Sequence, residues 1–135
     1  MNETTRQEYN SFLLETRTRV NRYLNIALLC FTVAGPAIAL GVKAGFFPDV
    51  KYITCLVISV YVIAMTLIHF ILMKKMPKSL FTALFALTAL DILLVFMSYA
   101  RVNIFLTWFL VPLLSLLFCD KIIFFYSVFL NYVLM

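Results

Sequence analysis

Five apolar segments recur along this chain, separated by short polar stretches. They lie at about residues 24–42, 53–73, 80–98, 104–118 and 122–135. A helix that crosses the hydrocarbon core of a membrane needs about 20 apolar residues, with about 17 near the minimum. The first three segments meet this length, whereas the fourth has 15 residues and the fifth has 14. The pattern predicts an all-α fold, a polytopic transmembrane helix bundle over residues 23–135, whose last span is cut short.

The first 22 residues form a separate polar segment with three Glu and four Arg. Within it a stripe recurs at spacings of four, three, four and three residues, made of Tyr9, Leu13, Thr16, Val20 and Tyr23. This heptad spacing marks one side of a helix. Because no Gly or Pro interrupts the stripe before the first apolar segment, we predict an amphipathic cytoplasmic helix continuous with the first span. The alternative is a lone helix lying on the membrane surface.

The composition excludes an ordinary soluble domain. The 135 residues are 64% hydrophobic and 13% charged, and the mean hydropathy is +1.03. A soluble domain is about 45–50% apolar and about 25% charged, so the lipid bilayer is the expected partner of this apolar surface. The net charge of +5 does not indicate nucleic acid, because the basic residues are scattered among short loops instead of gathered on one face.

The distribution of Lys and Arg predicts the orientation. With the N-terminus inside, eight basic residues fall on the cytoplasmic side: Arg6, Arg17, Arg19, Arg22, Lys74, Lys75, Lys78 and Lys121. Three fall outside: Lys43, Lys51 and Arg101. Cytoplasmic loops carry the excess of basic residues, so we predict a multi-pass protein of the inner (plasma) membrane with a cytoplasmic N-terminus. The sequence AIA at 37–39 resembles a signal-peptide cleavage site, but the region before it is too long and acidic for one.

Asp91 is an ionisable residue within the third apolar segment. It lies about 12 residues from the predicted cytoplasmic start of that span, or about 18 Å at 1.5 Å per residue. This depth is near the middle of a hydrocarbon core of about 30 Å. A carboxylate there is costly, so we expect Asp91 to face the bundle and to be mostly neutral at pH 7. It is a functional-site candidate, and a purely structural role in helix packing is the alternative.

The same depth arithmetic indicates which polar residues lie level with Asp91. Tyr61 is about 20 Å from the inner face and Asn131 about 15 Å, so both match Asp91. His69 is only about 8 Å deep and matches Ser115 better. These five residues are the candidates for a ligand or proton site, although His69 is more often a hydrogen-bonded interfacial histidine than a proton relay.

No motif predicts a cofactor, a metal site or catalysis in this chain. Cys30, Cys55 and Cys119 have no C-x-x-C spacing and no nearby histidine, so neither zinc nor a disulfide framework is expected. No phosphate loop, hydrolytic triad or haem-ligand pair is found. We therefore expect the chain to be no enzyme by itself.

Gly and Pro residues predict local features of the spans. Gly41 and Gly45 have the G-x-x-x-G spacing that lets two helices approach closely, although Gly45 is near the predicted end of the span. Pro36 and Pro112 should kink the first and fourth spans.

The stretch SLFTALFALTALDILLVFMSYARVNIFLTWFLVPLLSLLFCDK, residues 79–121, resembles the membrane sensor region of bacterial signalling proteins. In those proteins a short cytoplasmic helix precedes about six spans and an output domain such as a diguanylate cyclase, a histidine kinase or a chemotaxis-type module. The resemblance implies a sensory module whose sixth span and output domain lie beyond Met135, and a homodimer is a candidate assembly. The alternative function is a small transporter, or an accessory subunit of one, that uses Asp91.

Overall fold

The predicted all-α fold is confirmed by the computed structural model, which describes residues 3–46, 50–99 and 108–135. All regular structure in these ranges is helical, and the five helices are α1 (Glu3–Lys43), α2 (Tyr52–Lys75), α3 (Leu80–Tyr99), α4 (Leu110–Leu116) and α5 (Lys121–Leu134). Within the described ranges, three helices are long and apolar enough to cross a membrane, namely α1, α2 and α3. This length and composition indicate a membrane protein.

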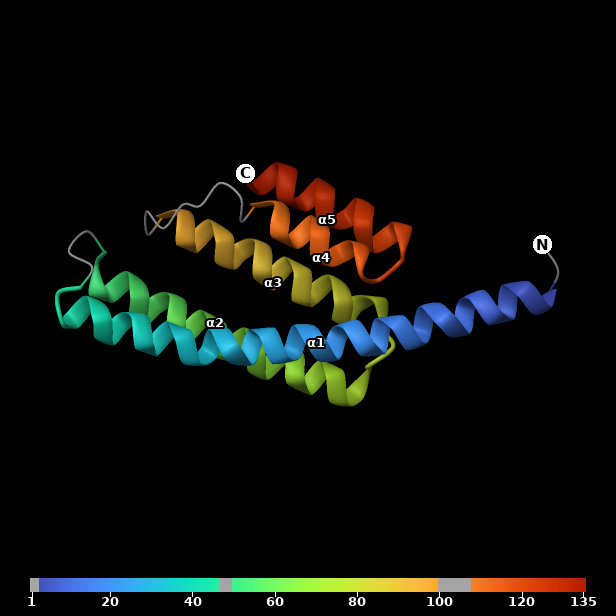
Figure 1. Cartoon of the computed structure of the whole chain (residues 1–135), viewed down its shortest axis with the longest axis horizontal. Coiled ribbons are helices and arrows are strands. Elements are labelled where there is room, and N and C mark those ends of the chain that lie inside the picture. The colour runs from blue at the N-terminus through green and yellow to red at the C-terminus, as the bar shows by residue number, and fades with distance from the viewer. Residues whose placement is uncertain (1–2, 47–49, 100–107) are drawn as a thin grey trace.

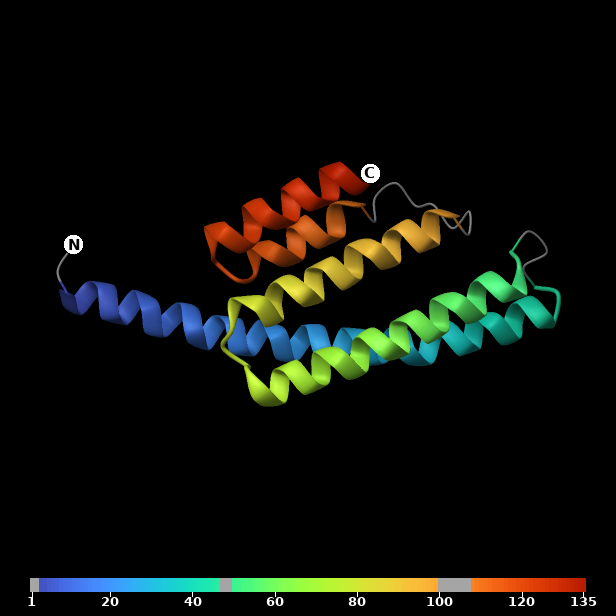
Figure 2. The same cartoon turned by 180° about the vertical axis from the view of Figure 1, so that it is seen from behind.

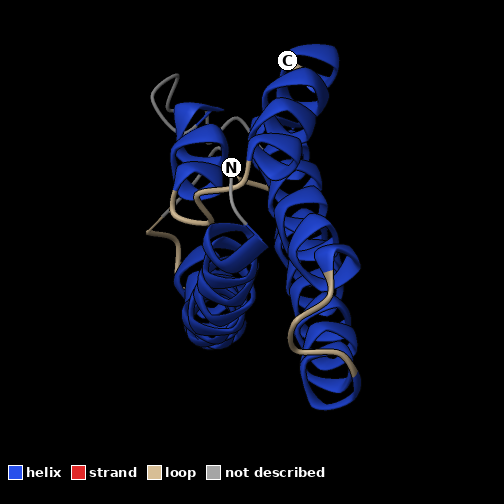
Figure 3. Ribbon diagram, turned by 90° about the vertical axis from the view of Figure 1, so that its right-hand side faces the viewer, coloured by secondary structure: helices blue, strands red, loops and turns tan. Residues whose placement is uncertain are grey.

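The third helix lies at the centre of the bundle. Figures 1 and 2 show α3 between the α1–α2 hairpin on one side and the α4–α5 hairpin on the other, and α3 contacts all four of these helices. In Figure 3, which looks along the long axis, the helices are seen nearly end-on. We call the end from which the N-terminus projects the proximal end and the opposite end the distal end. The turns at 76–79 and 117–120 lie at the proximal end.

The first helix is unbroken over 41 residues, which confirms the predicted continuity of the N-terminal helix with the first apolar segment. No Gly or Pro precedes Gly35 within α1, and the helix runs on through Pro36 to Lys43. Residues 3–12 are all exposed, and this part of α1 projects beyond the other helices in Figure 1. The cytoplasmic location of this part stays a prediction.

The fourth apolar segment differs most from its prediction. Its described helix, α4, covers only Leu110–Leu116 after a short 3₁₀ turn at Trp108 and Phe109; residues 104–107, like Arg101, lie outside the described residues. Pro112 is in the first turn of α4, where its missing N–H leaves no intrahelical hydrogen bond unmade. Pro112 therefore interrupts no hydrogen bond within the described helix, and the predicted kink of the fourth span stays a prediction. The fifth segment, α5, has 14 residues and is shorter than the three candidate spans.

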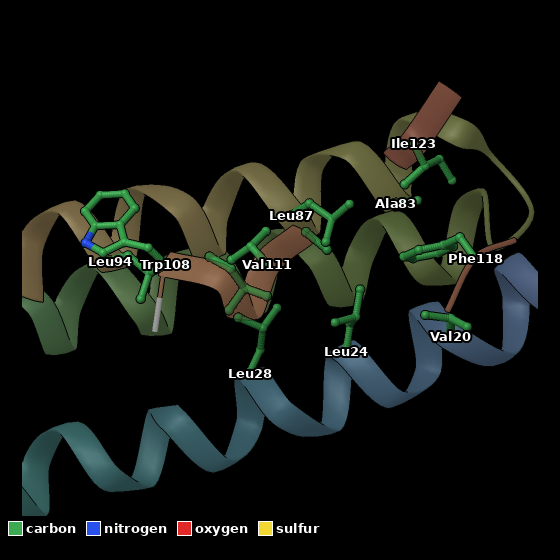
Figure 4. Packing of buried hydrophobic residues seen from close by; sticks show 12 residues of the cluster. Val20, Leu24, Leu28, Ala83, Leu87, Leu94, Trp108, Val111, Phe118 and Ile123 are labelled. Atoms are coloured by element: carbon green, nitrogen blue, oxygen red, sulfur yellow. The ribbon is translucent and has the colours of Figure 1, made fainter. Parts of the chain in front are cut away.

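Small residues on α3 allow close packing at the centre of the bundle. Ala83 and Ala86 are fully buried, and side chains from four helices pack around them. Figure 4 shows this cluster, which comprises Val20, Leu24, Leu28, Ala83, Ala86, Leu87, Leu90, Leu94, Trp108, Val111, Phe118 and Ile123. Small residues let helices approach closely where no water drives their association. The apolar core therefore joins the proximal half of α1 to α3, α4 and α5.

The glycines do not form the predicted helix-pairing motif. α1 ends at Lys43, and Gly45 follows in a turn with a φ of +85°, a value that favours glycine. Gly41 and Gly45 thus do not share one helix face. The close approach is made by Gly35 instead, because a Cβ atom there would lie 2.8 Å from Ser59 Oγ of α2.

Candidate functional site

Asp91 is fully buried, as predicted, and it pairs with Asn131. The carboxylate on α3 has 0% relative exposure, and its Oδ1 accepts a hydrogen bond of 2.9 Å from Asn131 Nδ2 on α5. Its other oxygen, Oδ2, is also buried and has no hydrogen-bond partner. A polar group of this kind inside apolar surroundings is energetically unfavourable unless it is paired. The Asp91–Asn131 pair is therefore the strongest candidate site in the described part of the chain.

Tyr61 lies near the predicted level but does not bind Asp91. Its hydroxyl donates a hydrogen bond of 3.0 Å to the carbonyl oxygen of Ala89 on α3. Its ring packs against Phe96, with 5.2 Å between ring centroids and 58° between planes. Tyr61 therefore joins α2 to α3 beside the Asp91 site without completing it.

A second polar contact joins α3 to α5 one turn closer to the proximal end. The hydroxyl oxygens of Thr88 and Tyr126 are 2.9 Å apart. Ser127 is fully buried, and its hydroxyl has no partner. The sequence offered a partial signal for this contact, because Thr88 and Asp91 are three residues apart, a spacing that places both on one face of α3. We call the contacts Thr88–Tyr126 and Asp91–Asn131 the α3–α5 seam.

His69 and Ser115 do not meet, so their predicted match in depth is not a contact. His69 Nδ1 lies 3.2 Å from Asn25 Oδ1 on α1, whereas Ser115 Oγ donates to the carbonyl oxygen of Pro112 within its own helix at 2.5 Å. The physical reason is that equal depth does not make two helices neighbours: the helix that packs most extensively along α2 is α1. Both side chains are fully buried, and His69 Nε2 has no hydrogen-bond partner.

Polar and small residues line the contact between α1 and α2 at three successive levels. Besides Asn25 and His69, the hydroxyl oxygens of Thr32 and Thr66 are 3.1 Å apart. Farther toward the distal end, Gly35 lies against Ser59. We call these three contacts the α1–α2 seam. Sequence reasoning missed it, although small and polar residues at helical spacing are its signal.

An ion pair at the proximal end was also missed. Arg17 of α1 forms a salt bridge with Asp120, and the two side chains are only 16% and 6% exposed. Asp120 also caps α5, because its Oδ1 accepts a hydrogen bond of 2.9 Å from the backbone N–H of Ile122. One turn along α1, Asn21 Nδ2 donates to the carbonyl oxygen of Pro77 at 3.2 Å. These contacts fix α1 to both proximal turns. Opposite charges at the ends of two apolar segments were the available signal.

The geometry limits the chemistry that the buried polar groups support. Asp91 can hold a proton on Oδ2, because that carboxylate oxygen has no hydrogen-bond partner in the protein. His69 is eight residues from Tyr61 along α2, about 12 Å of helix, so it lies far from the Asp91 level. In the described residues, no group of three or more His, Cys, Asp and Glu side chains is placed to hold a metal ion.

Comparisons of the chain with protein-family models, with curated proteins and with solved structures found no match.

Proposed function

We propose that this chain is an integral membrane sensory or regulatory module of a bacterial signalling protein. In this proposal a change within the helix bundle passes along α1 to a cytoplasmic output domain outside these 135 residues. The observation that carries the proposal is the unbroken helix α1, Glu3–Lys43. Its distal part packs along α2, whereas residues 3–12 are exposed and project beyond the bundle. A single helix that belongs to both regions can transmit a displacement between them.

The proximal contacts supply the one arrangement of α1 that the proposal requires at rest. Arg17 and Asn21 bind the turns at 117–120 and 76–79, so a shift of α1 must keep or break both contacts together. A sensor needs two discrete arrangements whose equilibrium the stimulus biases. The salt bridge would hold one of them.

In the proposed orientation the chain crosses the inner membrane five times and its N-terminus lies in the cytoplasm. Basic residues at the proximal end support it, because Lys74 and Lys75 end α2 and Lys121 begins α5. Lys43 and Lys51 are the basic residues described at the distal end. Single cysteines at Lys51 and Lys75, in a cysteine-free background, should react with an impermeant reagent from opposite sides. Reaction of both from outside would contradict this orientation.

The decisive experiment measures signalling output from the natural protein in membranes, with and without residues 3–12. We expect the deletion to abolish the response to stimulus, because the helix segment that contacts the output domain is gone. The control is Gln7→Ala, which keeps the helix length and changes an exposed side chain outside the predicted stripe. An unchanged response after the deletion would remove the coupling role of α1.

A transporter is the second candidate, and the unpartnered Oδ2 of buried Asp91 favours it. A carboxyl group at mid-depth that can bind and release a proton is the part a proton-coupled carrier needs. Uptake driven by a proton gradient in liposomes containing the purified chain, abolished by Asp91→Asn, would establish this function. No uptake under a gradient would leave the sensory proposal favoured.

A further inference from the structure

The distal half of the bundle contains an apolar cavity that the Asp91 site does not use. Its volume is about 280 Å³, and residues of α1, α2 and α3 line it. The lining contains only aliphatic, aromatic, glycine and thioether residues and the thiol of Cys55. An apolar cavity of about 150 Å³ stays dry and takes up benzene. This cavity is nearly twice that size, and because its lining is apolar, water is not its expected occupant.

The cavity is elongated along the helices. On α1 its lining runs from Phe31 to Ile38, and on α2 it includes Cys55 and Val62. Each of these pairs is seven residues apart, or about 10 Å of helix. An occupant of this shape would lie parallel to the three helices that are long and apolar enough to cross a membrane.

The cavity has a buried floor and an exposed rim. Cys55, Val62 and Leu93 form the floor and are 7%, 3% and 5% exposed. Phe31 and Ile38 on α1 form the rim and are 39% and 50% exposed. The opening is therefore lateral, on the side of the bundle that a bilayer would surround.

We propose that this cavity binds one acyl chain of a membrane lipid, which enters laterally past the α1 rim. The bilayer supplies apolar chains at this depth, already aligned with the helix axes. A compact apolar solute would leave part of the length unfilled, and a polar ligand would find only the weakly hydrogen-bonding thiol of Cys55 in the lining. An acyl chain seated there contacts α1, α2 and α3 at once. The proposal rests on the membrane placement of these helices and is independent of the sensory role.

The test uses the whole chain in phosphatidylcholine vesicles that contain a lipid with a photoreactive diazirine on one acyl chain. After illumination, mass spectrometry maps the labelled residues. We expect labelling of the floor residues Cys55, Val62 and Leu93, which surrounding lipid does not reach. Labelling confined to outward residues such as Val33 and Val60, which are 73% and 66% exposed, would overturn the proposal. Floor labelling by a photoreactive adamantane, without floor labelling by the lipid, would overturn it in favour of a compact solute.

Matched variants sharpen this test. Ala34→Phe places a ring in the cavity and should reduce floor labelling about tenfold, while Ala37→Phe, on the same helix but outside the lining, should leave it unchanged. Leu93→Ala enlarges the floor and should increase labelling of Val62, which keeps the test valid if Ala34→Phe fails to fold. Equal floor labelling in all three variants would contradict the proposal. Vesicle labelling does not depend on signalling output, so its failure would leave the sensory proposal standing.

Discussion

The α1–α2 seam and the α3–α5 seam both join two helices through polar side chains, but they differ in how those side chains are satisfied. In the α1–α2 seam, the hydroxyl oxygens of Thr32 and Thr66 also lie 3.0 and 2.7 Å from carbonyl oxygens one turn back in their own helices. Each hydroxyl therefore has an acceptor in its own helix for its single proton, as does Ser59 at 2.8 Å. In the α3–α5 seam, Thr88 also has an acceptor in its own helix, the carbonyl oxygen of Leu84 at 2.8 Å. Asp91 has one partner, Asn131, and one oxygen without any.

This difference predicts which contacts tolerate substitution of a polar side chain. A hydroxyl that can bond its own helix stays satisfied when its partner across the seam is lost. A buried carboxyl has no such internal partner, so loss of Asn131 leaves it unpaired, and an unpaired buried polar group is costly. The Thr32–Thr66 and Gly35–Ser59 contacts of the α1–α2 seam should therefore be robust, and the Asp91–Asn131 contact of the α3–α5 seam should be sensitive.

The largest effect is expected where the proximal ion pair links the two seams, since Arg17 is on α1 and Asp120 caps α5. Asp120→Ala should lower stability by about 3 kcal/mol, because it leaves Arg17 without its partner in a largely buried site. The measurement is the free energy of unfolding in detergent. The control is Glu15→Ala, which breaks the exposed Arg19–Glu15 pair and should lower stability by about 0.5 kcal/mol or less. Equal losses in the two variants would contradict the linking role.

The next effect tests the sensitive seam directly. Asn131→Leu should lower stability by about 2 kcal/mol, because it leaves Asp91 buried without a hydrogen bond. Asp91→Leu combined with Asn131→Leu should recover most of that loss, because no polar group is then left unpaired, and a double-mutant cycle measures the coupling. Asp91→Asn should preserve folding. If Asn131→Leu alone were neutral, the seams would not differ in the way described.

A smaller effect is expected from Gly35→Ala in the α1–α2 seam. The new Cβ would lie 2.8 Å from Ser59 Oγ and 3.4 Å from Ser59 Cα, so the hydroxyl must move and stability should fall by about 1 kcal/mol. Combining it with Ser59→Ala removes the clashing atom and should restore the thermal midpoint. Failure of that rescue would show that the backbones, and not the hydroxyl, set the spacing of α1 and α2.

The smallest effect should come from Thr32→Val. Thr66 keeps its bonds to the carbonyl oxygens of Val62 and Leu28, so the loss should be about 0.6 kcal/mol, the average for polar contacts between membrane helices. Thermal unfolding in detergent, beside Asn131→Leu, gives the comparison. A loss as large as that of Asn131→Leu would reverse the ranking of the two seams.

The first three helices were predictable because charged or polar residues mark the ends of long apolar runs. The predicted ranges 53–73 and 80–98 correspond to α2 at Tyr52–Lys75 and α3 at Leu80–Tyr99. Depth arithmetic also placed Asn131, together with Tyr61, level with Asp91, and Asn131 is the one of the two that bonds it. Both predictions use only distances along a helix axis, which follow from the number of residues between two positions.

The remaining contacts depend on which helices are neighbours and on how each helix is rotated about its axis. The depth of a residue along its helix gives neither piece of information. His69 binds Asn25 instead of matching Ser115 because α1, and not α4, lies along its face of α2. Tyr61 is near the right level, yet its hydroxyl reaches the Ala89 carbonyl oxygen. The salt bridge joins residues 103 positions apart, and only the packing of α1 against the α4–α5 turn brings them together.

The unbroken course of α1 also fixes an angular relation. Each residue of a helix advances the side-chain direction by about 100° and the axis by 1.5 Å. Because α1 is one helix, the face that Tyr9 presents keeps a fixed angle to the face of Gly35, which packs against Ser59 about 39 Å away along the axis. In the proposed sensor, a rotation of the distal part of α1 would turn the projecting part by the same angle, so α1 would transmit helical phase as well as displacement.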